Sequence, residues 1–341
     1  TYAYDYVTLL RTHALGDFKA FVRQIGLTPA MLIYLDGVEN IAGKPNENYA
    51  RELLELFTMG IGNYTEDDIK EIARALTGWR LNRFTNTVFF NPQLHDDGEK
   101  TIFGQSGNFG YDDVVDLIFQ ERGEAVARFV CTELYRQFVY VEEDTGVVDK
   151  LAAMLVDSDF QIEPVIRTLL KSAHFFDGVF YGAQIKSPVQ FFLAFVRDGA
   201  VDPERNFRNT TIFQVAFRLQ EQLGQILFNP PDVSGWPGHR DWISSASLTE
   251  RWTLAQGFAV LGNPQGVISN LSNPADPWIV AGELATLLSP LPPGDEDLDG
   301  LVEALLDGTP SYEWDPDSDG GLARLGNYIA YLMQLPEYQL A

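Results

Sequence analysis

The sequence has few of the residues on which several common protein classes depend. It has one cysteine, Cys131, in 341 residues, so it has no internal disulfide framework and no metal site built from clustered cysteines. No apolar run approaches the roughly 20 residues of a membrane-spanning helix. Basic residues number 24 against 48 acidic ones, which gives a net charge of −24. Because nucleic acids and anionic membranes attract basic surfaces, this charge argues against both as partners.

Short catalytic motifs are also missing. The sequence contains no G-x-S-x-G, no phosphate-binding loop and no dinucleotide fingerprint. Its four histidines form no H-x-x-x-H or H-x-H pair, so a zinc site would need ligands from distant segments. An enzyme is not excluded, because catalytic groups also assemble from distant positions in a sequence.

Helical periodicity is what the sequence contains over most of its length. Apolar residues at helical spacing predict a helix from Thr65 to Thr77, and another from Glu47 to Met59 with Asn46 as its N-cap and Gly60 at its end. The same pattern predicts further helices at 17–25, 111–119, 124–139, 147–158, 163–171, 188–198, 211–223, 248–260, 278–288, 298–306 and 322–332.

These patterns predict an all-α, multi-helix fold. The helical pattern stops near residues 80–105, where a short irregular or β segment is expected and where 87–90 has the composition of one strand of a hairpin. The linker-like stretch 289–294 is expected to separate a main helical domain, 1–288, from a small acidic helical cap, 289–341, packed on it. One continuous domain is the alternative.

Acidic residues are concentrated in the last quarter of the chain. From Arg251 to Ala341 there are two basic and thirteen acidic residues, a net charge of −11. Such a surface suits cations or a basic partner. It also suits an exported protein that stays in solution through a hydrated acidic face, and both interpretations stay open.

Six segments, in the same order along the chain, carry a family resemblance. They are 29–36 (PAMLIYLD), 46–56 (NENYARELLEL), 73–79 (ARALTGW), 95–100 (HDDGEK), 230–238 (PPDVSGWPG) and 336–339 (PEYQ). Together they resemble the bacterial domain of unknown function 1800 family. The resemblance implies a largely helical, exported protein, and it implies no reaction, because none is established for the family.

The resemblance also bears on the ends of the chain and on one position. Family members usually carry further residues before the segment that matches Thr1, and no signal-peptide pattern begins there, so we expect the sequence to be a processed or shortened piece. Many members have histidine where this chain has Phe57, which argues against a metal ligand or an acid–base group at that position.

The predicted helix 47–59 carries a dense polar face opposite its apolar stripe. Glu47 and Glu55 each lie four residues from Arg51, within reach of its guanidinium. Glu52 and Glu55 are three residues apart, close enough to share a proton or a cation. This face is either a polar cleft with Glu52 or Glu55 as acid or base, or an ion-pair network that joins helices.

The loop 95–100 brings an imidazole, carboxylates and an ammonium group together. His95 is a candidate ligand-binding residue, and Asp96 and Lys100 are candidates for a catalytic site. The structural alternative is a turn formed by Asp96 and an ion pair formed by Lys100.

The segment 315–320 matches the start of a calcium-binding loop, D-x-D-x-D-G. Asp315, Asp317 and Asp319 would supply the oxygen ligands. The twelfth position, which holds a bidentate acid in such loops, is Gly326. The segment is therefore either a calcium site or an acidic turn, and calcium is the one cofactor that the sequence indicates.

The loop 235–242 holds two tryptophans among glycine and proline residues. If exposed, Trp236 and Trp242 would stack on sugar rings or pack against a partner protein. If buried, they would pin the loop to the helices.

These observations predict an exported cell-envelope or extracellular protein that acts through binding or assembly, with a protein partner or a second copy of itself. The alternative is an exported hydrolase acting on polysaccharide. In that case Glu52 or Glu55 would be the acid or base, with Arg51, Asp96 and Lys100 nearby.

Overall fold

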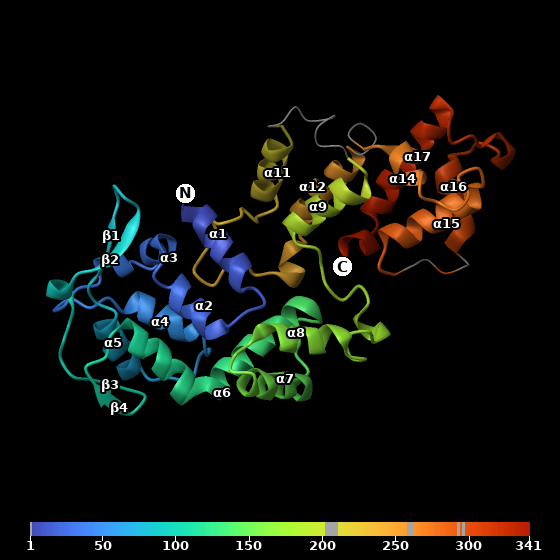
Figure 1. Cartoon of the computed structure of the whole chain (residues 1–341). Helices are drawn as coiled ribbons and strands as arrows, with labels where there is room; N and C mark the ends of the chain where they lie inside the picture. The colour runs from blue at the N-terminus through green and yellow to red at the C-terminus, as the bar shows by residue number, and fades with distance from the viewer. Residues whose placement is uncertain (1, 202–210, 258–261, 292–293, 295–296) are drawn as a thin grey trace. The chain divides into compact units, whose positions relative to one another are not determined.

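The computed structural model describes residues 2–201, 211–257, 262–291, 294 and 297–341. Within these residues the fold is all-α, with fifteen α-helices and two antiparallel sheets of two strands each (Figure 1). This confirms the predicted fold class. Residue contacts divide the chain into two compact units, 1–176 and 177–341.

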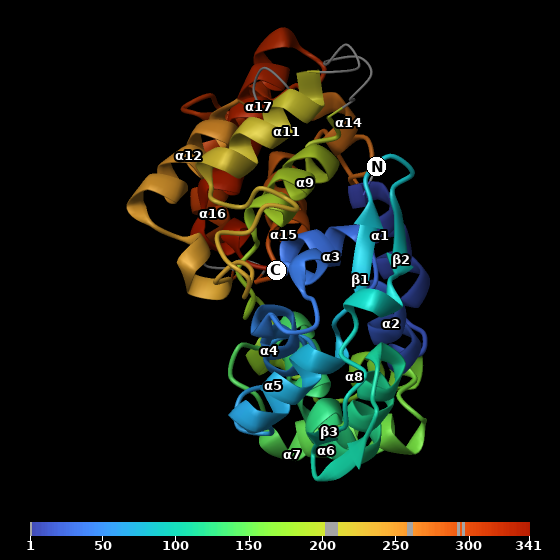
Figure 2. The same ribbon diagram turned by 90° about the vertical axis from the view of Figure 1, so that its left-hand side faces the viewer.

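The N-terminal unit holds both sheets. In chain order its elements are α1 (Tyr2–His13), α2 (Phe18–Ile25), α3 (Pro29–Tyr34), α4 (Glu47–Glu55), α5 (Glu66–Ala75), β1 (Trp79–Asn82), β2 (Thr87–Phe90), β3 (Lys100–Ile102), β4 (Gln105–Gly107), α6 (Tyr111–Phe138), α7 (Thr145–Asp157) and α8 (Ile162–Lys171). Helix α4 packs beside α5, and α6 packs along α7 (Figures 1 and 2).

Side-chain caps determine where α4 and α5 begin. The side chain of Asn46 accepts a hydrogen bond from the amide of Asn48 at the start of α4. Thr65 and Asp68 form a reciprocal capping box at the start of α5. Helix α4 ends at Glu55, earlier than predicted, and the following turn ends at Gly60, whose φ is +76°. The two caps hold the helical hairpin that carries the polar face of α4.

The segment between α5 and α6 contains more β structure than the sequence predicted. The expected strand 87–90 is β2, which pairs with β1 in a hairpin that Figure 2 shows beside α1. The second hairpin, β3–β4, was not predicted, because its three-residue strands show too little alternation to be recognised. Helix α6 joins the predicted helices 111–119 and 124–139, and it is non-helical at Arg122, where φ is −132° and ψ is 17°.

The helices of the C-terminal unit surround a core of their own. They are α9 (Pro188–Asp198), α11 (Thr211–Gln222), α12 (Ser245–Gln256), α14 (Pro264–Ile268), α15 (Pro277–Leu288), α16 (Leu298–Leu306) and α17 (Asp319–Gln334). Phe195, Ala255, Leu284, Leu305 and Ile329 are among the buried residues of this core. Helices on both sides of residue 289 therefore contribute to one core, while 292–293 of the predicted linker lie outside the described residues.

Most predicted helices in this unit have the expected positions. Ser187 and Gln190 form a capping box in front of α9, with Pro188 at the first helical position. Helix α12 ends at Gln256, and residues 258–260 of its predicted range lie outside the described residues. None of the described helices is both long enough and apolar enough to cross a membrane.

Candidate functional site

On the polar face of α4, Arg51 is held by the neighbouring helix. Its guanidinium donates to both carboxylate oxygens of Glu66 on α5, at 2.8 and 2.7 Å, and one oxygen of Glu47 lies 3.6 Å away. This bidentate pair raises the pKa of Arg51 and lowers that of Glu66. Arg51 therefore joins α4 to α5 rather than pointing toward an open site.

Glu55 is bound by a phenol instead of by the arginine. The hydroxyl of Tyr64 donates to Glu55 at 2.7 Å. Burial, together with this hydrogen bond, raises the pKa of Tyr64 to about 12. The expected ion pair between Arg51 and Glu55 does not occur among the described residues, because the Arg51 guanidinium is bound to Glu66 instead.

Glu52 is the carboxyl group of α4 that has no partner. Only 9% of the residue is exposed, and no hydrogen bond or ion pair to its side chain occurs among the described residues. Burial raises its pKa, and the negative charge of Glu55 raises it further. A carboxyl group in this state suits proton transfer, so Glu52 is the acid–base candidate that the geometry retains.

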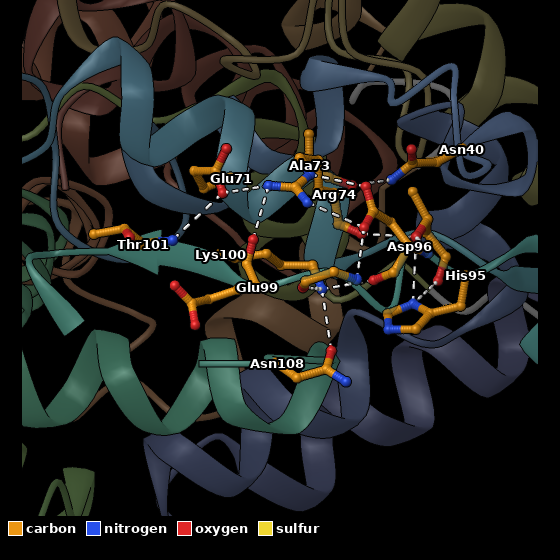
Figure 3. A network of polar contacts seen from close by, with 12 residues as sticks. Asn40, Glu71, Ala73, Arg74, His95, Asp96, Glu99, Lys100, Thr101 and Asn108 are labelled. Atoms are coloured by element: carbon orange, nitrogen blue, oxygen red, sulfur yellow. Dashed lines mark hydrogen bonds and ion pairs between the residues drawn. The ribbon is translucent and has the colours of Figure 1, made fainter. Parts of the chain in front are cut away.

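Asp96 and Arg74 form the centre of a second polar group (Figure 3). The Arg74 Nε and Nη2 atoms donate to the two oxygens of Asp96, at 2.8 and 3.1 Å, while Nη1 donates to Glu71 at 2.6 Å. The hydrogen bonds from Arg74, together with an amide hydrogen bond from Gly98, lower the pKa of Asp96 to about 2. Asp96 is thus a fully paired carboxylate that anchors its loop to α5.

Lys100 and His95 complete this group. Lys100 is 1% exposed, and its ammonium donates to the carbonyl oxygens of Asp96 and Gly98 at 2.6 and 3.0 Å. Burial lowers the pKa of Lys100. The Nδ1 atom of His95 lies 2.9 Å from the carbonyl oxygen of Thr77, to which it donates a hydrogen bond.

The structure thus separates the five catalytic candidates into two groups. Arg51, Glu52 and Glu55 share α4, whereas Asp96 and Lys100 belong to the loop beside α5, and no hydrogen bond or ion pair of the described residues connects the groups. The loop contacts are those of a turn with a buried cation. They stabilise the fold around β3 and expose no reactive pair.

A pocket lies against the apolar face of α4, away from Arg51. Its volume is about 340 Å³. Five helices and the turn after α4 contribute lining residues, among them Tyr6, Phe21, Met31, Leu53, Phe57 and Phe129. Glu133 is the one charged residue among the described residues that line it. The lining is almost wholly apolar, and the volume lies at the lower end of the range of small-molecule sites.

Two tyrosines meet beside Gly26, and one of them, Tyr49, lines this pocket. The hydroxyl of Tyr111 donates to the carbonyl oxygens of Val22 and Arg23, at 3.2 and 3.0 Å. The hydroxyl of Tyr49 is buried beside the Tyr111 hydroxyl, and burial, together with the interaction with Tyr111, raises the pKa of Tyr49 well above its ordinary value. Both hydroxyls lie against Gly26, whose lack of a side chain leaves room for them. Tyr49 and Gly26 both line the pocket.

The family relationship extends over almost the whole chain. A family model described as protein of unknown function (DUF1800) matches residues 1–340. The chain belongs to this family. A search of curated proteins and a search of solved structures each found no match. In this DUF1800 chain, the run 46–56, one of the six segments of the resemblance, contains α4. This helix carries Glu52, and its residues Tyr49 and Leu53 line the apolar pocket.

The other candidates of this DUF1800 chain lie in the C-terminal unit. Trp242 is buried, 8% exposed, at the end of a short 3-10 helix, and Trp236 is partly buried. Asp315 accepts a hydrogen bond from the amide of Asp317, and Asp319 is the first residue of α17. No three His, Cys, Asp or Glu side chains in the described ranges are gathered as metal ligands.

Two features of the sites escaped sequence reasoning. The pocket was missed because its wall residues come from separate helices, and because the sequence around Gly26 looks like an ordinary helix end.

Arg251 was counted only as a charge, yet it is fully buried. It donates to the carbonyl oxygen of Lys186 at 2.8 Å and to Gln339 at 3.4 Å. Burial lowers the pKa of Arg251 to about 10. It joins the segment before α9 to the end of the chain.

Proposed function

We propose that this protein acts by binding, and that its N-terminal unit takes a small, largely apolar molecule in the pocket beside α4. The observation that carries the proposal is the pocket itself, about 340 Å³ in volume and lined almost wholly by apolar side chains. The pocket opens to the surface, and ligand sites begin at about this volume. A concave, apolar surface of this kind supports the binding of a small molecule.

We also propose that the protein is exported, to the cell envelope or beyond it. The support is the family resemblance of the sequence, which implies an exported protein, and the net charge of −24, which keeps a protein in solution. Fractionation of cells that express the whole gene product tests this part, and a product confined to the cytoplasm would contradict it.

The binding proposal is tested with toluene, an apolar probe that has no polar group. Toluene should raise the Tm of the wild type, because a ligand that binds only the folded state stabilises it. Leu56→Trp, which fills the pocket from its wall, should abolish the shift. Leu15→Trp, at a leucine that is 55% exposed and outside the pocket, is the matched control. No shift in the wild type, or an equal shift in Leu56→Trp, would reject the proposal.

A hydrolase is the second candidate function, and it is supported by Glu52. Its side chain has no hydrogen bond or ion pair to the described residues and a raised pKa, two properties of general acids in glycoside hydrolysis. Glu55 beside it is hydrogen-bonded to Tyr64 and not to an arginine. Loss of polysaccharide hydrolysis in Glu52→Gln, with unchanged folding, would establish this function.

A further inference from the structure

The tip of the β1–β2 hairpin, residues 82–87, presents an aromatic ring and a guanidinium group to solvent. Phe84 is 100% exposed, more than any other large apolar side chain of the described residues. The adjacent Arg83 is exposed, and it forms no hydrogen bond or ion pair with the part of the chain that the structure describes. Figure 1 shows the hairpin projecting from the N-terminal unit. Aromatic and arginine side chains are those that most often anchor contacts between proteins.

Side-chain hydrogen bonds hold this tip in shape. The Oδ1 atom of Asn82 accepts hydrogen bonds from the amides of Phe84 and Thr85, at 2.9 and 3.2 Å. The hydroxyl of Tyr2 donates to the side chain of Asn86 at 2.7 Å. A tip that is already ordered loses little conformational entropy when it binds, so the exposed Phe84 is suited to docking.

The charge around the tip is opposite to that of the chain as a whole. Residues 72–95 contain three arginines and no acidic residue, in a protein with a net charge of −24. Arg74 is paired with Asp96, and Arg80 donates to a backbone carbonyl oxygen. Arg83 is the arginine of this segment that is left for a partner, and the surface that suits it is acidic.

The C-terminal unit carries an open groove with the complementary features. The groove lies beside α15 and α16, has a volume of about 390 Å³, and is lined by Trp278, Asp299 and Glu303 together with residues 308–311. The Trp278 side chain is 42% exposed. Asp299 and Glu303 are exposed one helical turn apart on α16, and neither carboxylate is bonded to another of the described residues. From 252 to 323 the sequence has twelve acidic residues and no basic one.

A second copy of the chain therefore offers what the tip lacks, an aromatic wall beside two carboxylates. We infer that the β1–β2 tip of one molecule docks into the Trp278 groove of another. The Phe84 ring packs on the Trp278 indole, and the Arg83 guanidinium binds Asp299 and Glu303. Because each copy has one such tip and one such groove, the contact is head-to-tail and joins molecules into open chains or rings. It does not depend on the pocket beside α4.

Sedimentation equilibrium of the whole chain, up to about 1 mM, tests this inference, because contacts smaller than a standard interface are weak. The mass of the wild type should rise with concentration, and less so at high salt, which screens the Arg83 pair. Phe84→Ser and Glu303→Lys should each weaken association by about tenfold or more. Both side chains are exposed, so neither variant should lose Tm. Ile61→Ser, at an apolar residue that is 78% exposed and outside the tip, is the matched control and should associate like the wild type.

A mixture of the two variants tests the pairing itself. The Phe84→Ser chain keeps an intact groove, and the Glu303→Lys chain keeps an intact tip. At a concentration where each variant alone is a monomer, equal amounts should form dimers with one chain of each, which native mass spectrometry distinguishes by mass. A wild type that stays monomeric throughout, unchanged association in either variant, or a mixture without mixed dimers would overturn the inference.

Discussion

Gly26 leaves the space into which the hydroxyl of Tyr49 fits. A Cβ atom at position 26 would lie 2.1 Å from the Tyr49 oxygen, far inside contact distance. Gly26 ends α2 in a right-handed helical conformation, with φ of −64° and ψ of −26°, so the backbone itself does not require glycine. The space that the Tyr49 side chain needs, and not the backbone conformation, explains why a glycine stands at the end of α2.

Gly26→Ala is therefore expected to disturb the pocket. The new methyl group must displace the Tyr49 and Tyr111 hydroxyls, which should lower the free energy of unfolding by about 1–3 kcal/mol and weaken toluene binding. Urea denaturation and calorimetry measure the two effects. Gly16→Ala, where the nearest atoms lie 3.7 Å from the new Cβ, is the control and should change neither. Equal behaviour of the two variants would show that the hydroxyls do not occupy this space.

Asp96→Asn should destabilise the N-terminal unit in a pH-dependent way. The pKa of Asp96 is lowered from 3.8 to about 2, so the pair with Arg74 contributes fully above the ordinary value and is lost as the pH falls toward the lowered one. At neutral pH we expect a loss of about 1–3 kcal/mol in the free energy of unfolding. The difference from the wild type should shrink in acid. Asp97→Asn, at an exposed neighbour, should have little effect, and a pH-independent loss would contradict this account.

Glu52→Gln should act in the opposite direction. Because the pKa of Glu52 is raised in the folded state, its charge costs stability above that pKa, and the cost disappears as the pH falls toward the ordinary value of 4.5. The variant should therefore have a higher Tm than the wild type at neutral pH and a similar Tm in acid. Glu99→Gln, at an exposed glutamate, serves as the control. A lower Tm at neutral pH would mean that the Glu52 carboxylate has a stabilising partner.

The segment 315–320 is expected to behave as a turn in front of α17. Ser318 caps this helix by accepting a hydrogen bond from the amide of Gly321 at 3.0 Å. Ser318→Ala should lower the free energy of unfolding by about 1 kcal/mol, whereas a calcium chelator should leave the Tm of the wild type unchanged. A Tm that falls on chelation and recovers with added calcium would instead establish the calcium site.

Local rules predicted the parts of this structure that depend on neighbouring residues. Asn46 and Thr65 cap their helices as their chemistry predicts, and the stripe of α5 is buried. Helices α1 and α3 were missed, because α1 buries no residue completely and α3 has only six residues, too few for a clear period. The all-α class followed from the long periodic segments, which make up most of the chain.

The site was only half predictable for a related reason. The spacing of Arg51, Glu52 and Glu55 on one helix face follows from the helix period. Their partners do not, since Tyr64 and Glu66 reach them only through the turn between α4 and α5. The pocket depends on how five helices pack, which no local pattern records.

Methionine methyl groups offer the most direct test of ligand binding beside α4. The sequence has four methionines, and among them Met31 lines the pocket whereas Met59, Met154 and Met333 do not. With ¹³C-methyl methionine, titration with 1-octanol should shift the Met31 resonance in a saturable way and leave the other three in place. An unmoved Met31 resonance at saturating 1-octanol, or equal shifts of all four, would contradict the account.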